Sequence, residues 1–290
     1  MILLLGSSGY IGAAFQLYFK ANDIEFTTCS VRYPLNVSIF RNTLIRNKVT
    51  HVINCTGFVG QPNVDSCELD RDQTLLANSI LPKTLSNVCA EHGVKFIHVS
   101  SGCIYSDHRC DLGLAPQKEF TEDDIPNFCF DQSRYSWYSA TKALGEDLLC
   151  KNGDLIVRVR IPFNEEVNPR NYISKILQYP VLLNATNSFS HLDEFVAATF
   201  ELRNNWGTFN LTQPGYLTTK QVVEMLQKHG LAKDKMFFKG IKDFELTVKT
   251  PRSNCVLSSS KAILSDIKLT CLEDSLENAI SVYKFNLNAK

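Results

Sequence analysis

Tyr138 and Lys142 are four residues apart in the segment YSATK, a spacing that can support acid–base chemistry on a helix. Side chains at positions i and i+4 share one helix face, so the ammonium group would lie beside the phenol. A nearby positive charge lowers the pKa of a phenol, and the tyrosine could then act as an acid toward a carbonyl group that receives hydride. The same spacing is common on solvated helix faces, so its weight depends on the surrounding pattern.

A serine and a cysteine follow the apolar segment Val94–Val99, which has the pattern of a buried strand. Ligands of open α/β sheets bind at the carboxyl ends of strands, where Ser101 could donate a hydrogen bond to the same carbonyl oxygen. Cys103 comes two residues later. Most cysteines are simply buried, but a thiol at this place could move a proton at the carbon next to the carbonyl.

The Cys103 thiol would need help to act as a base at neutral pH. The ordinary pKa of a thiol is about 8.5, so a nearby cation would have to stabilise the thiolate. Lys175, within NPRNYISK (168–175), is our candidate for that cation, although its spacing alone assigns it no special role.

Gly6, Gly9 and Gly12 form the pattern GxxGxxG between a predicted strand, Ile2–Leu5, and a predicted helix, Tyr10–Lys20. In a dinucleotide-binding loop the first glycine makes a tight turn, the second lets the backbone approach a pyrophosphate, and the third packs helix against strand. The helix N-terminus adds N–H donors for the phosphates. A turn that only needs a positive φ is the alternative, and it explains less of this context. The residues that we expect to contact the dinucleotide are Gly6, Ser8, Gly9, Tyr10, Ile11, Gly12, Cys55, Thr56, Gly57, Asn78, Tyr138 and Lys142.

The end of the second predicted strand, Thr27–Arg32, indicates which dinucleotide is bound. An NAD enzyme usually has an acidic residue here for the ribose hydroxyls, and this segment has none. Arg32 could instead pair with a 2′-phosphate, so we expect NADPH, with NADH left open as a second donor. The alternative is that Arg32 is a solvated surface charge.

The composition is that of an ordinary globular protein and excludes several function classes. Of 290 residues, 44% are hydrophobic and 21% are charged, and 30 basic residues balance 30 acidic ones. A neutral chain lacks the basic surface that nucleic acid or an anionic membrane requires, and no apolar run reaches the ~18 residues of a membrane helix. The 10 cysteines lack the close spacing of a zinc site, so we expect no metal, and reduced thiols in the cytoplasm.

Apolar runs alternate with helical patterns through the first 160 residues, which predicts βαβ units and a parallel sheet. We expect strands at 2–5, 25–29, 50–54, 94–99 and 155–160, and helices at 10–20, 36–47, 71–92, 137–150, 171–179, 191–203 and 218–229. Pro82 should bend or break the helix at 71–92. The predicted fold class is α/β, a Rossmann-type doubly wound parallel sheet with a smaller C-terminal α/β substrate lobe. We assign residues 1–160, with a returning segment at about 186–212, to an NADP-binding domain, and residues 161–185 and 213–290 to the lobe.

The glycine loop together with Ser101, Tyr138 and Lys142 resembles the pattern of extended short-chain dehydrogenases/reductases. A closer resemblance runs collinearly over essentially the whole chain. It is to the C-terminal epimerase/reductase part of plant UDP-rhamnose synthases, which also exists as a stand-alone protein in plants and giant DNA viruses. The segments that carry it are GQPNVDSCE (60–68), SSGCIY (100–105), NPRNYISKI (168–176), NSFSHLDE (187–194), FNLTQPG (209–215) and PRSN (251–254).

This resemblance implies a bifunctional 3,5-epimerase/4-reductase that converts UDP-4-keto-6-deoxy-D-glucose to UDP-L-rhamnose with NADPH. Ser101 stands where the family has threonine. Tyr138 and Lys142 match the reductase pair, and Cys103 and Lys175 match the epimerisation pair. The candidates for substrate contacts are Gln61, Asn63, Asn171 and Arg252. The resemblance also implies a cytoplasmic homodimer, in the host cytoplasm if viral, that acts downstream of a separate UDP-glucose 4,6-dehydratase.

Two features depart from the family pattern, and three other interpretations stay open. The loop 6–12 reads GSSGYIG in place of a GKTGWIG type, and the segment 106–136 is longer. A dTDP-4-dehydrorhamnose reductase would share the serine, tyrosine and lysine but rely on a separate epimerase. A GDP-fucose synthase has a similarly placed cysteine with a histidine partner and would prefer a GDP-sugar. A reductase-like regulatory subunit would bind NADP and a partner protein without turnover.

Overall fold

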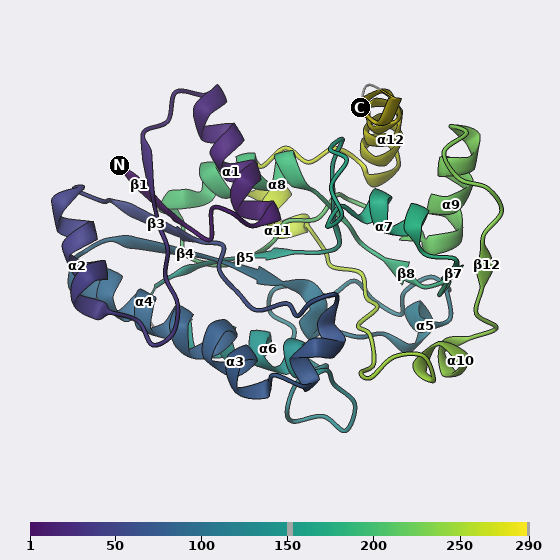
Figure 1. Cartoon of the computed structure of the whole chain (residues 1–290), viewed down its shortest axis with the longest axis horizontal. Coiled ribbons are helices and arrows are strands. Elements are labelled where there is room, and N and C mark those ends of the chain that lie inside the picture. Colours follow the sequence, from purple (N-terminus) through teal and green to yellow (C-terminus); the bar gives the residue numbers. More distant parts are fainter. Residues whose placement is uncertain (150–152, 289–290) are drawn as a thin grey trace.

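The computed structural model describes residues 1–149 and 153–288, and its centre is a six-stranded sheet (Figure 1). The strands are β1 (Ile2–Leu5), β2 (Phe26–Cys29), β3 (His51–Asn54), β4 (Lys95–Ser101), β5 (Leu155–Val159) and β10 (Gly207–Asn210). Their order is β10-β5-β4-β3-β1-β2, and every neighbouring pair is parallel. The predicted Rossmann-type parallel sheet is confirmed.

Helices cover both faces of this sheet (Figure 1). One face carries α1 (Tyr10–Ala21), α8 (Leu192–Glu201) and α11 (Ser260–Leu264), and the other carries α2 (Val37–Arg46), α3 (Arg71–Leu75), α4 (Leu81–Glu91) and α6 (Trp137–Leu149). Cys150, at the predicted end of α6, lies outside the described residues.

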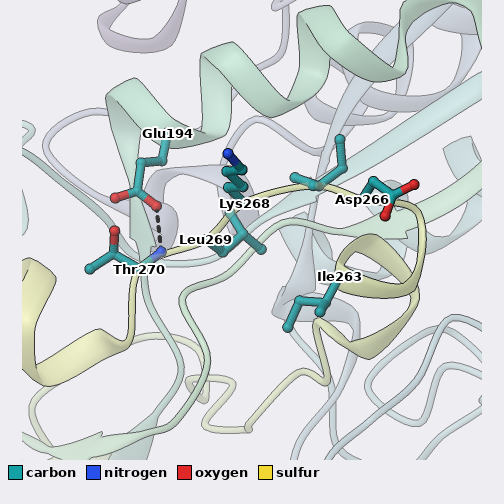
Figure 2. A pocket seen from close by; sticks show the side chains of 7 residues that line it. Glu194, Ile263, Asp266, Lys268, Leu269 and Thr270 are labelled. Carbon is teal, nitrogen blue, oxygen red and sulfur yellow. Dashed lines mark hydrogen bonds between the residues drawn. The ribbon is translucent and has the colours of Figure 1, made fainter.

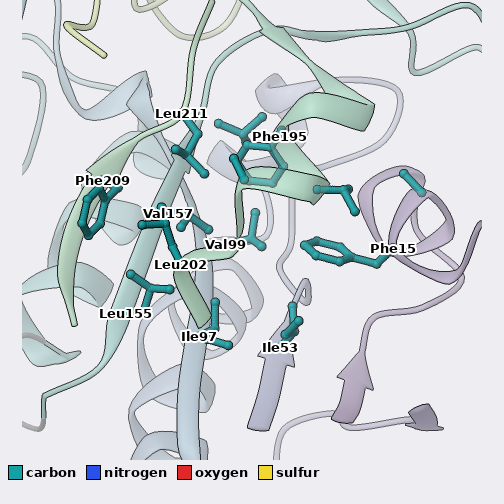
Figure 3. Packing of buried hydrophobic residues seen from close by; sticks show 14 of the residues in the cluster. Phe15, Ile53, Ile97, Val99, Leu155, Val157, Phe195, Leu202, Phe209 and Leu211 are labelled. Atoms are coloured by element: carbon teal, nitrogen blue, oxygen red, sulfur yellow. The ribbon is translucent and has the colours of Figure 1, made fainter. Parts of the chain in front are cut away.

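The strands are apolar on both sides, as a covered parallel sheet requires. Because side chains alternate along a strand, Ile53 packs in a cluster with Phe15 and Phe195 on the α1 face (Figure 3). The adjacent residue Val52 packs with Phe40 in the cluster on the opposite face. Both layers are fully buried around these residues, so the sheet is a rigid base for the loops at its ends.

The chain reverses its direction across the sheet at β1. From β1 it passes outward to β2 and then crosses back to β3 on the other side, so the loops after β1 and β3 diverge. The register aligns the strand ends, because Leu5 lies beside Asn54 and Asn54 lies beside His98. A crevice at the carboxyl ends of the strands is the expected ligand site at such a switch point.

The predicted helix 71–92 is a continuous helical path with an irregular centre. A π-helical turn, Leu76–Ile80, separates α3 from α4. Pro82 lies in the first turn of α4 and has no N–H to donate to the carbonyl of Asn78. The helix therefore continues through Pro82, and the lost hydrogen bond coincides with the wider π-helical turn that precedes it. Gly145 of α6 lets that carbonyl come close, because a Cβ at Gly145 would lie 2.4 Å from the Asn78 oxygen. This contact fixes how closely α6 packs against the turn Leu76–Ile80.

The remaining elements form a smaller C-terminal lobe (Figure 1). Its helices are α5 (His108–Asp111), α7 (Tyr172–Gln178), α9 (Thr219–Lys228), α10 (Ile241–Glu245) and α12 (Leu272–Asn288). Its short strands are β6 (Pro162–Phe163), β7 (Val181–Leu182), β8 (Thr186–Asn187), β9 (Ser190–His191), β11 (Leu217–Thr218) and β12 (Met236–Phe237). The lobe has its own core, which includes Phe163, Phe189, Leu226 and Ile280.

Later segments of the chain return to the sheet. α8 packs against α1, and β10 pairs with β5. Ala262 and Ile267, in the part that we assign to the lobe, also lie in the core of the sheet. The division into residues 1–160 with 186–212, against 161–185 and 213–290, therefore remains a proposal. Within the described ranges, none of the helices is both long and apolar enough to cross a bilayer.

Candidate active site

Ser101, Cys103 and Tyr138 meet at the carboxyl end of β4. Ser101 is the last residue of the strand, and its hydroxyl oxygen accepts a hydrogen bond from the Cys103 backbone N–H at 3.3 Å. This bond begins a short 3₁₀ turn, Gly102–Ile104, which carries Cys103 inward to 8% exposure. On α6, the side chain of Tyr138 forms a hydrogen bond with Ser101. The structure therefore brings together three residues that we predicted around one carbonyl group.

Burial dominates the electrostatics of Tyr138. It raises the pKa of the phenol, the thiols of Cys103 and Cys67 add to the rise, and Arg160 opposes it. We expected Lys142 to lower this pKa, and it is not among the largest contributions to it. At neutral pH the phenol is therefore protonated, which is the state an acid needs.

Lys142 faces the loop that follows β3. It is 4% exposed, and its ammonium donates a hydrogen bond to the Val99 carbonyl at 3.5 Å. A Cβ at Gly57 would lie 3.3 Å from Nζ of Lys142. Burial lowers the pKa of Lys142, and Cys103 and Glu146 partly offset that change. Lys142, on the same helix as Tyr138, thus reaches the predicted cofactor loop at Gly57.

The thiol of Cys103 lies among hydroxyl groups and cations. The pKa of this thiol is raised, because the effect of burial outweighs the hydrogen bonds with Ser101 and Ser139 and the charges of Arg160 and Lys142, all of which lower it. Neither Ser139 nor Arg160 was predicted from the sequence. Ser139 directly follows Tyr138 in the YSATK segment, and this position was the only signal for it in the sequence.

Arg160 follows β5 at the same edge of the sheet and is 4% exposed. Its guanidinium donates to the Ser253 hydroxyl at 3.1 Å, to the Ser253 carbonyl at 2.7 Å, and to Asn187. Arg158, two residues earlier, forms an ion pair with Glu146 at 2.7 Å. The signal for Arg160 was a charged residue at the end of the predicted strand 155–160, at the edge where ligands bind.

Among the described residues, no hydrogen bond joins Lys175 to Cys103. Lys175 projects from α7, is exposed, and within residues 1–149 and 153–288 its side chain makes no hydrogen bond or ion pair. Partial enclosure lowers the pKa of its ammonium, Arg170 adds to that change, and Cys103 is not among the groups that act on it. The cations that act on the Cys103 thiol are Arg160 and Lys142, so the structure does not give that part to Lys175.

The glycine loop is shaped to receive a phosphate group. Gly6 has φ +72°, and a Cβ there would lie 2.8 Å from the carbonyl group of Cys55. At Gly12 a Cβ would lie 2.2 Å from the Gly6 oxygen. Gly9 precedes α1 without a side-chain cap, which leaves the first N–H groups of the helix to a ligand. The loop therefore fits a dinucleotide pyrophosphate. No group of three potential metal ligands occurs in the part of the chain that the structure describes.

The other predicted residues of this loop lie at different depths. Ser8 is exposed, and Tyr10 and Ile11 are half-buried. The Tyr10 hydroxyl donates to Asn164 at 2.6 Å, which ties the loop to the lobe. Arg32 is exposed beyond β2 and forms no ion pair with the described residues, a position open both to a 2′-phosphate and to solvent.

The loop 55–57 after β3 is held by two asparagines. Thr56 donates to Asn54 from its N–H at 3.1 Å and from its hydroxyl at 2.6 Å. Asn78 is fully buried, accepts from the Phe58 N–H at 2.8 Å and donates to the Phe58 carbonyl at 3.0 Å. Its amide also donates to the Thr141 hydroxyl of α6 at 3.2 Å, so Asn78 is committed within the protein and would act on a cofactor through the loop's position.

An ion pair joins two of the predicted substrate segments. Arg252 donates to the Asp65 carboxylate at 2.8 Å. Asn63 begins the turn Val64–Glu68 by accepting a hydrogen bond from the Asp65 N–H at 2.8 Å, and Gln61 is exposed just before it. Asp65, which was not predicted, therefore connects the sheet domain to the lobe.

Asn171 is fully buried and serves the backbone. It accepts a hydrogen bond from the Ile173 N–H at 3.1 Å, which starts α7. Its amide donates to the carbonyls of Asn164 and Glu166, each at 2.7 Å. The Asn171 side chain is therefore not open to a sugar, and its effect is to fix the helix that carries Lys175.

Glu68 holds the start of the helix that carries Tyr138. Its carboxylate accepts a hydrogen bond from the Trp137 N–H at 2.7 Å. This bond satisfies one of the backbone N–H groups at the start of α6 that have no acceptor within the helix. Arg71 pairs with Glu68 at 3.2 Å and lies over the Trp137 ring at 4.8 Å. The GQPNVDSCE segment thus contributes to the site by orienting α6.

A cavity of about 720 Å³ lies between the start of α8 and the segment after α11 (Figure 2). Its lining residues are Glu194, Ile263, Asp266, Ile267, Lys268, Leu269 and Thr270. Glu194 accepts a hydrogen bond from the Thr270 N–H at 2.9 Å. None of the predicted site residues lines this cavity, so we do not assign the reaction to it.

A glycine loop after β1, with Ser101 at the end of β4 and with Tyr138 and Lys142 on α6, is the arrangement expected of a Rossmann-type reductase. The family described as "RmlD substrate binding domain" matches residues 1–181, more than half of the chain. The chain belongs to this family.

Known relatives support the same assignment. A bifunctional dTDP-4-dehydrorhamnose 3,5-epimerase/dTDP-4-dehydrorhamnose reductase from Arabidopsis thaliana is 33% identical over 287 residues, which cover 94% of this chain and 90% of that protein. The L780 UDP-rhamnose synthase from Acanthamoeba polyphaga mimivirus has the same fold, with a TM-score of 0.88 and 23% identity over 97% of this chain and 98% of that one. So has a dTDP-4-dehydrorhamnose reductase from Bacillus anthracis in complex with NADP, with a TM-score of 0.79 and 14% identity over 98% of each chain. The predicted family is confirmed, and the chain is an enzyme of the oxidoreductase and epimerase group of nucleotide-sugar rhamnose biosynthesis.

Proposed function

We propose that this enzyme converts UDP-4-keto-6-deoxy-D-glucose to UDP-L-rhamnose, inverting C3 and C5 and reducing C4 with NADPH. The observation that carries the proposal is that one hydroxyl, Ser101, contacts both Cys103 and Tyr138. A group that can move a carbon-bound proton and a group that can protonate an oxygen thus share one carbonyl site. The Arabidopsis relative, which is named for both activities, supports this assignment.

The epimerisation uses the acidity of the hydrogens next to the C4 ketone. Cys103, as a thiolate, takes a proton from C3 or C5: the C–H bond breaks, an S–H bond forms, and the electron pair moves to O4. Ser101 and Tyr138 donate hydrogen bonds to the resulting enolate oxygen. Lys175 returns a proton to the carbon from the opposite side and thereby inverts it. The two groups form a coupled pair, and the reverse assignment is the alternative.

This mechanism does not require Cys103 and Lys175 to touch. An inverting pair must approach the ring carbon from opposite sides, so its members lie across the substrate from each other. Lys175 projects from α7 and keeps an ammonium without a counter-ion among the described residues. Its lowered pKa favours proton release to carbon.

The reduction depends on the protonated form of Tyr138. Bound NADPH supplies the hydride that C4 accepts. The phenol of Tyr138 donates its proton to O4, and its raised pKa keeps that proton in place at neutral pH. Lys142, whose Nζ lies next to Gly57, would hold the nicotinamide ribose.

For the cofactor we favour NADPH over NADH. β2 ends at Cys29 without a carboxylate for the ribose hydroxyls, and Arg32 is exposed just beyond it. A 2′-phosphate would form a charge-assisted contact with this guanidinium. The bound NADP of the Bacillus anthracis reductase supports a nicotinamide cofactor in this fold.

The family resemblance also supplies the setting of the proposal. The enzyme would act as a cytoplasmic homodimer on the product of a separate UDP-glucose 4,6-dehydratase. Size-exclusion chromatography of the purified protein tests the dimer, and a coupled reaction with such a dehydratase tests the order of the two steps.

The proposed activity can be tested in one reaction. Purified protein, UDP-4-keto-6-deoxyglucose and NADPH are mixed in deuterated water, and the product is read by NMR. We expect UDP-L-rhamnose with deuterium at C3 and C5. A 6-deoxy sugar reduced at C4 without deuterium would identify a plain reductase and overturn the roles of Cys103 and Lys175. No turnover with NADPH bound would reject this substrate in favour of a dTDP- or GDP-sugar, or of the regulatory subunit.

A further inference from the structure

We propose that Arg160 is a positioning residue whose uncompensated buried charge stabilises the thiolate form of Cys103 against the effect of burial. The inference rests on the proposed function, in which Cys103 moves protons at the carbons next to the ketone. The sequence suggested Lys175 as the cation that stabilises the Cys103 thiolate, and we assign this part to Arg160 instead.

The charge of Arg160 is buried without a counter-ion. No carboxylate of the described residues forms an ion pair with it, its hydrogen bonds go to neutral acceptors on Ser253 and Asn187, and its Nε has no partner. Arg158 shows the usual arrangement, because its guanidinium meets the Glu146 carboxylate at 2.7 Å. An uncompensated buried cation is costly, which suggests that something nearby depends on its charge.

The stem of Arg160 packs against the turn that carries Cys103. A Cβ at Gly102 would lie 3.4 Å from Cδ of Arg160. On the same side, the thiol of Cys255 donates to the Gly102 carbonyl at 3.4 Å. The positive charge is thus held close to the turn, and it acts on Cys103, Tyr138 and Cys255 alike.

The groups that face Cys103 from other elements do not replace this cation. From α6 come Tyr138, Ser139 and Lys142, of which only Lys142 carries a charge, and burial lowers its pKa. From the turn Val64–Glu68 comes Cys67, and burial raises the pKa of this thiol to about 11. Lys142 also has a cofactor to hold in the proposed mechanism, which leaves Arg160 as the cation dedicated to the thiol.

Two carboxylates act on the thiols near Arg160: Asp111, which pairs with Arg134 at 3.4 Å, and Asp107, which acts on Cys255. Asp107 accepts hydrogen bonds from two backbone N–H groups, of Arg109 at 2.8 Å and Gln117 at 2.6 Å. Asp107 is therefore directed at the backbone and does not pair with Arg160.

The test measures the protonation of Cys103 directly in the full chain. The rate at which iodoacetamide alkylates Cys103, read by mass spectrometry of its peptide, is followed against pH. Arg160→Gln should raise the midpoint of this profile by about one pH unit or more, and Arg160→Lys should reverse part of the shift. Deuterium uptake at C3 and C5 should fall roughly tenfold in Arg160→Gln at neutral pH, because the thiolate fraction falls. NADPH affinity reports on folding.

Asn187→Asp is a nearly isosteric second test. It keeps the oxygen that accepts from Arg160 and from the Cys255 N–H, but it adds a negative charge beside the guanidinium. The same upward shift is expected. Arg203→Gln, which removes an arginine at the end of α8, is the matched control and should leave the midpoint unchanged.

An unchanged midpoint in Arg160→Gln or Asn187→Asp, with NADPH still bound, would overturn the proposal. The midpoint does not depend on turnover. If the wild-type enzyme incorporates no deuterium, the proposed epimerisation fails, and the midpoint still decides whether Arg160 acts on Cys103.

Discussion

The hydroxyl of Ser101 acts on both Cys103 and Tyr138, but the reaction needs Tyr138 protonated and Cys103 deprotonated. Burial raises the pKa of both side chains. For Tyr138 the rise helps, because an acid must hold its proton at neutral pH, whereas for Cys103 it hinders, because a base must lose it. The hydrogen bond with Ser139 offsets part of the rise at Cys103. The residue scale therefore predicts that the two activities can be separated by mutation.

Cys103→Ala should abolish deuterium uptake at C3 and C5, with a loss of at least about 100-fold, because the group that moves the proton is gone. NADPH affinity should be unchanged, since the glycine loop is untouched. Cys89→Ala, which truncates a thiol buried in the core beneath α4, is the matched control and should retain uptake. Normal exchange in Cys103→Ala would remove Cys103 from the mechanism.

Tyr138→Phe should lower the rate of reduction at C4 by about 10²–10⁴-fold, because the proton donor to O4 is missing. Deuterium uptake should persist at a reduced rate, since Cys103 and Ser101 remain. Stopped-flow loss of NADPH absorbance measures the first effect and NMR the second. Tyr135→Phe, in the loop before α6, serves as the control. Reduction at the wild-type rate in Tyr138→Phe would contradict the assignment.

At the scale of elements, the ends of the buried strands could be predicted because their sequence pattern is local. A short apolar run bounded by polar residues shows where a covered parallel strand stops. The next polar side chains then lie at the carboxyl edge of the sheet, where the structure has both Ser101 and Arg160.

The partners of polar residues in the loops could not be predicted, because the sequence does not show whether a ligand or the backbone takes their hydrogen bonds. Asn78 and Asn171 were expected to contact ligands, and the structure uses both amides to hold backbone segments. The contact between Asp65 and Arg252 depends on two segments far apart in the chain, for which no local pattern exists.

The start of α6 is one such backbone attachment with a testable consequence. Glu68→Ala removes the acceptor for the Trp137 N–H and should cost about 1 kcal/mol in the free energy of unfolding. Because α6 carries Tyr138, the rate of reduction should fall several-fold while NADPH affinity stays the same. Chemical denaturation and steady-state kinetics measure the two effects. Asp72→Asn, an exposed acid on α3, is the control. If Glu68→Ala lost stability but kept its full rate of reduction, the carboxylate would be only structural.

At the scale of the whole molecule, polar contacts help to join the lobe to the sheet domain. His191 caps the start of α8, which packs on the sheet domain, and it pairs with Glu165 of the lobe at 3.1 Å. Asp65 of the sheet domain pairs with Arg252 of the lobe at 2.8 Å. The two ion pairs respond to pH and to mutation in different ways, so each can be tested separately.

The His191–Glu165 pair should make stability depend on pH. Burial lowers the pKa of His191, but Glu165 and nearby acids outweigh that effect, so the net shift is upward. A histidine with a raised pKa contributes its full stability below the ordinary value of about 6.5, and the contribution is lost as pH rises through the folded value. Glu165→Gln should therefore lower the free energy of unfolding by on the order of 1 kcal/mol at slightly acidic pH, with a smaller difference at alkaline pH. Thermal unfolding across this range measures the effect, and a constant difference would refute it.

The Asp65–Arg252 pair should govern how the nucleotide sugar is held between the two parts. Asp65→Asn removes the charge that fixes Arg252, so the lobe segment that includes 251–254 loses an attachment to the loop 60–68. The expected result is a KM for the nucleotide sugar about tenfold higher, with little change in kcat, because a difference of about 1.4 kcal/mol in substrate binding corresponds to that factor. Glu91→Gln, which breaks an exposed ion pair within the sheet domain at 2.7 Å, is the matched control and should leave KM unchanged. Fluorescence titration with NADPH should give wild-type affinity in both variants, since the glycine loop lies on other elements. A fall in kcat with an unchanged KM would mean that Asp65 acts on the chemistry at β4 and not on the closing of the two parts around the substrate.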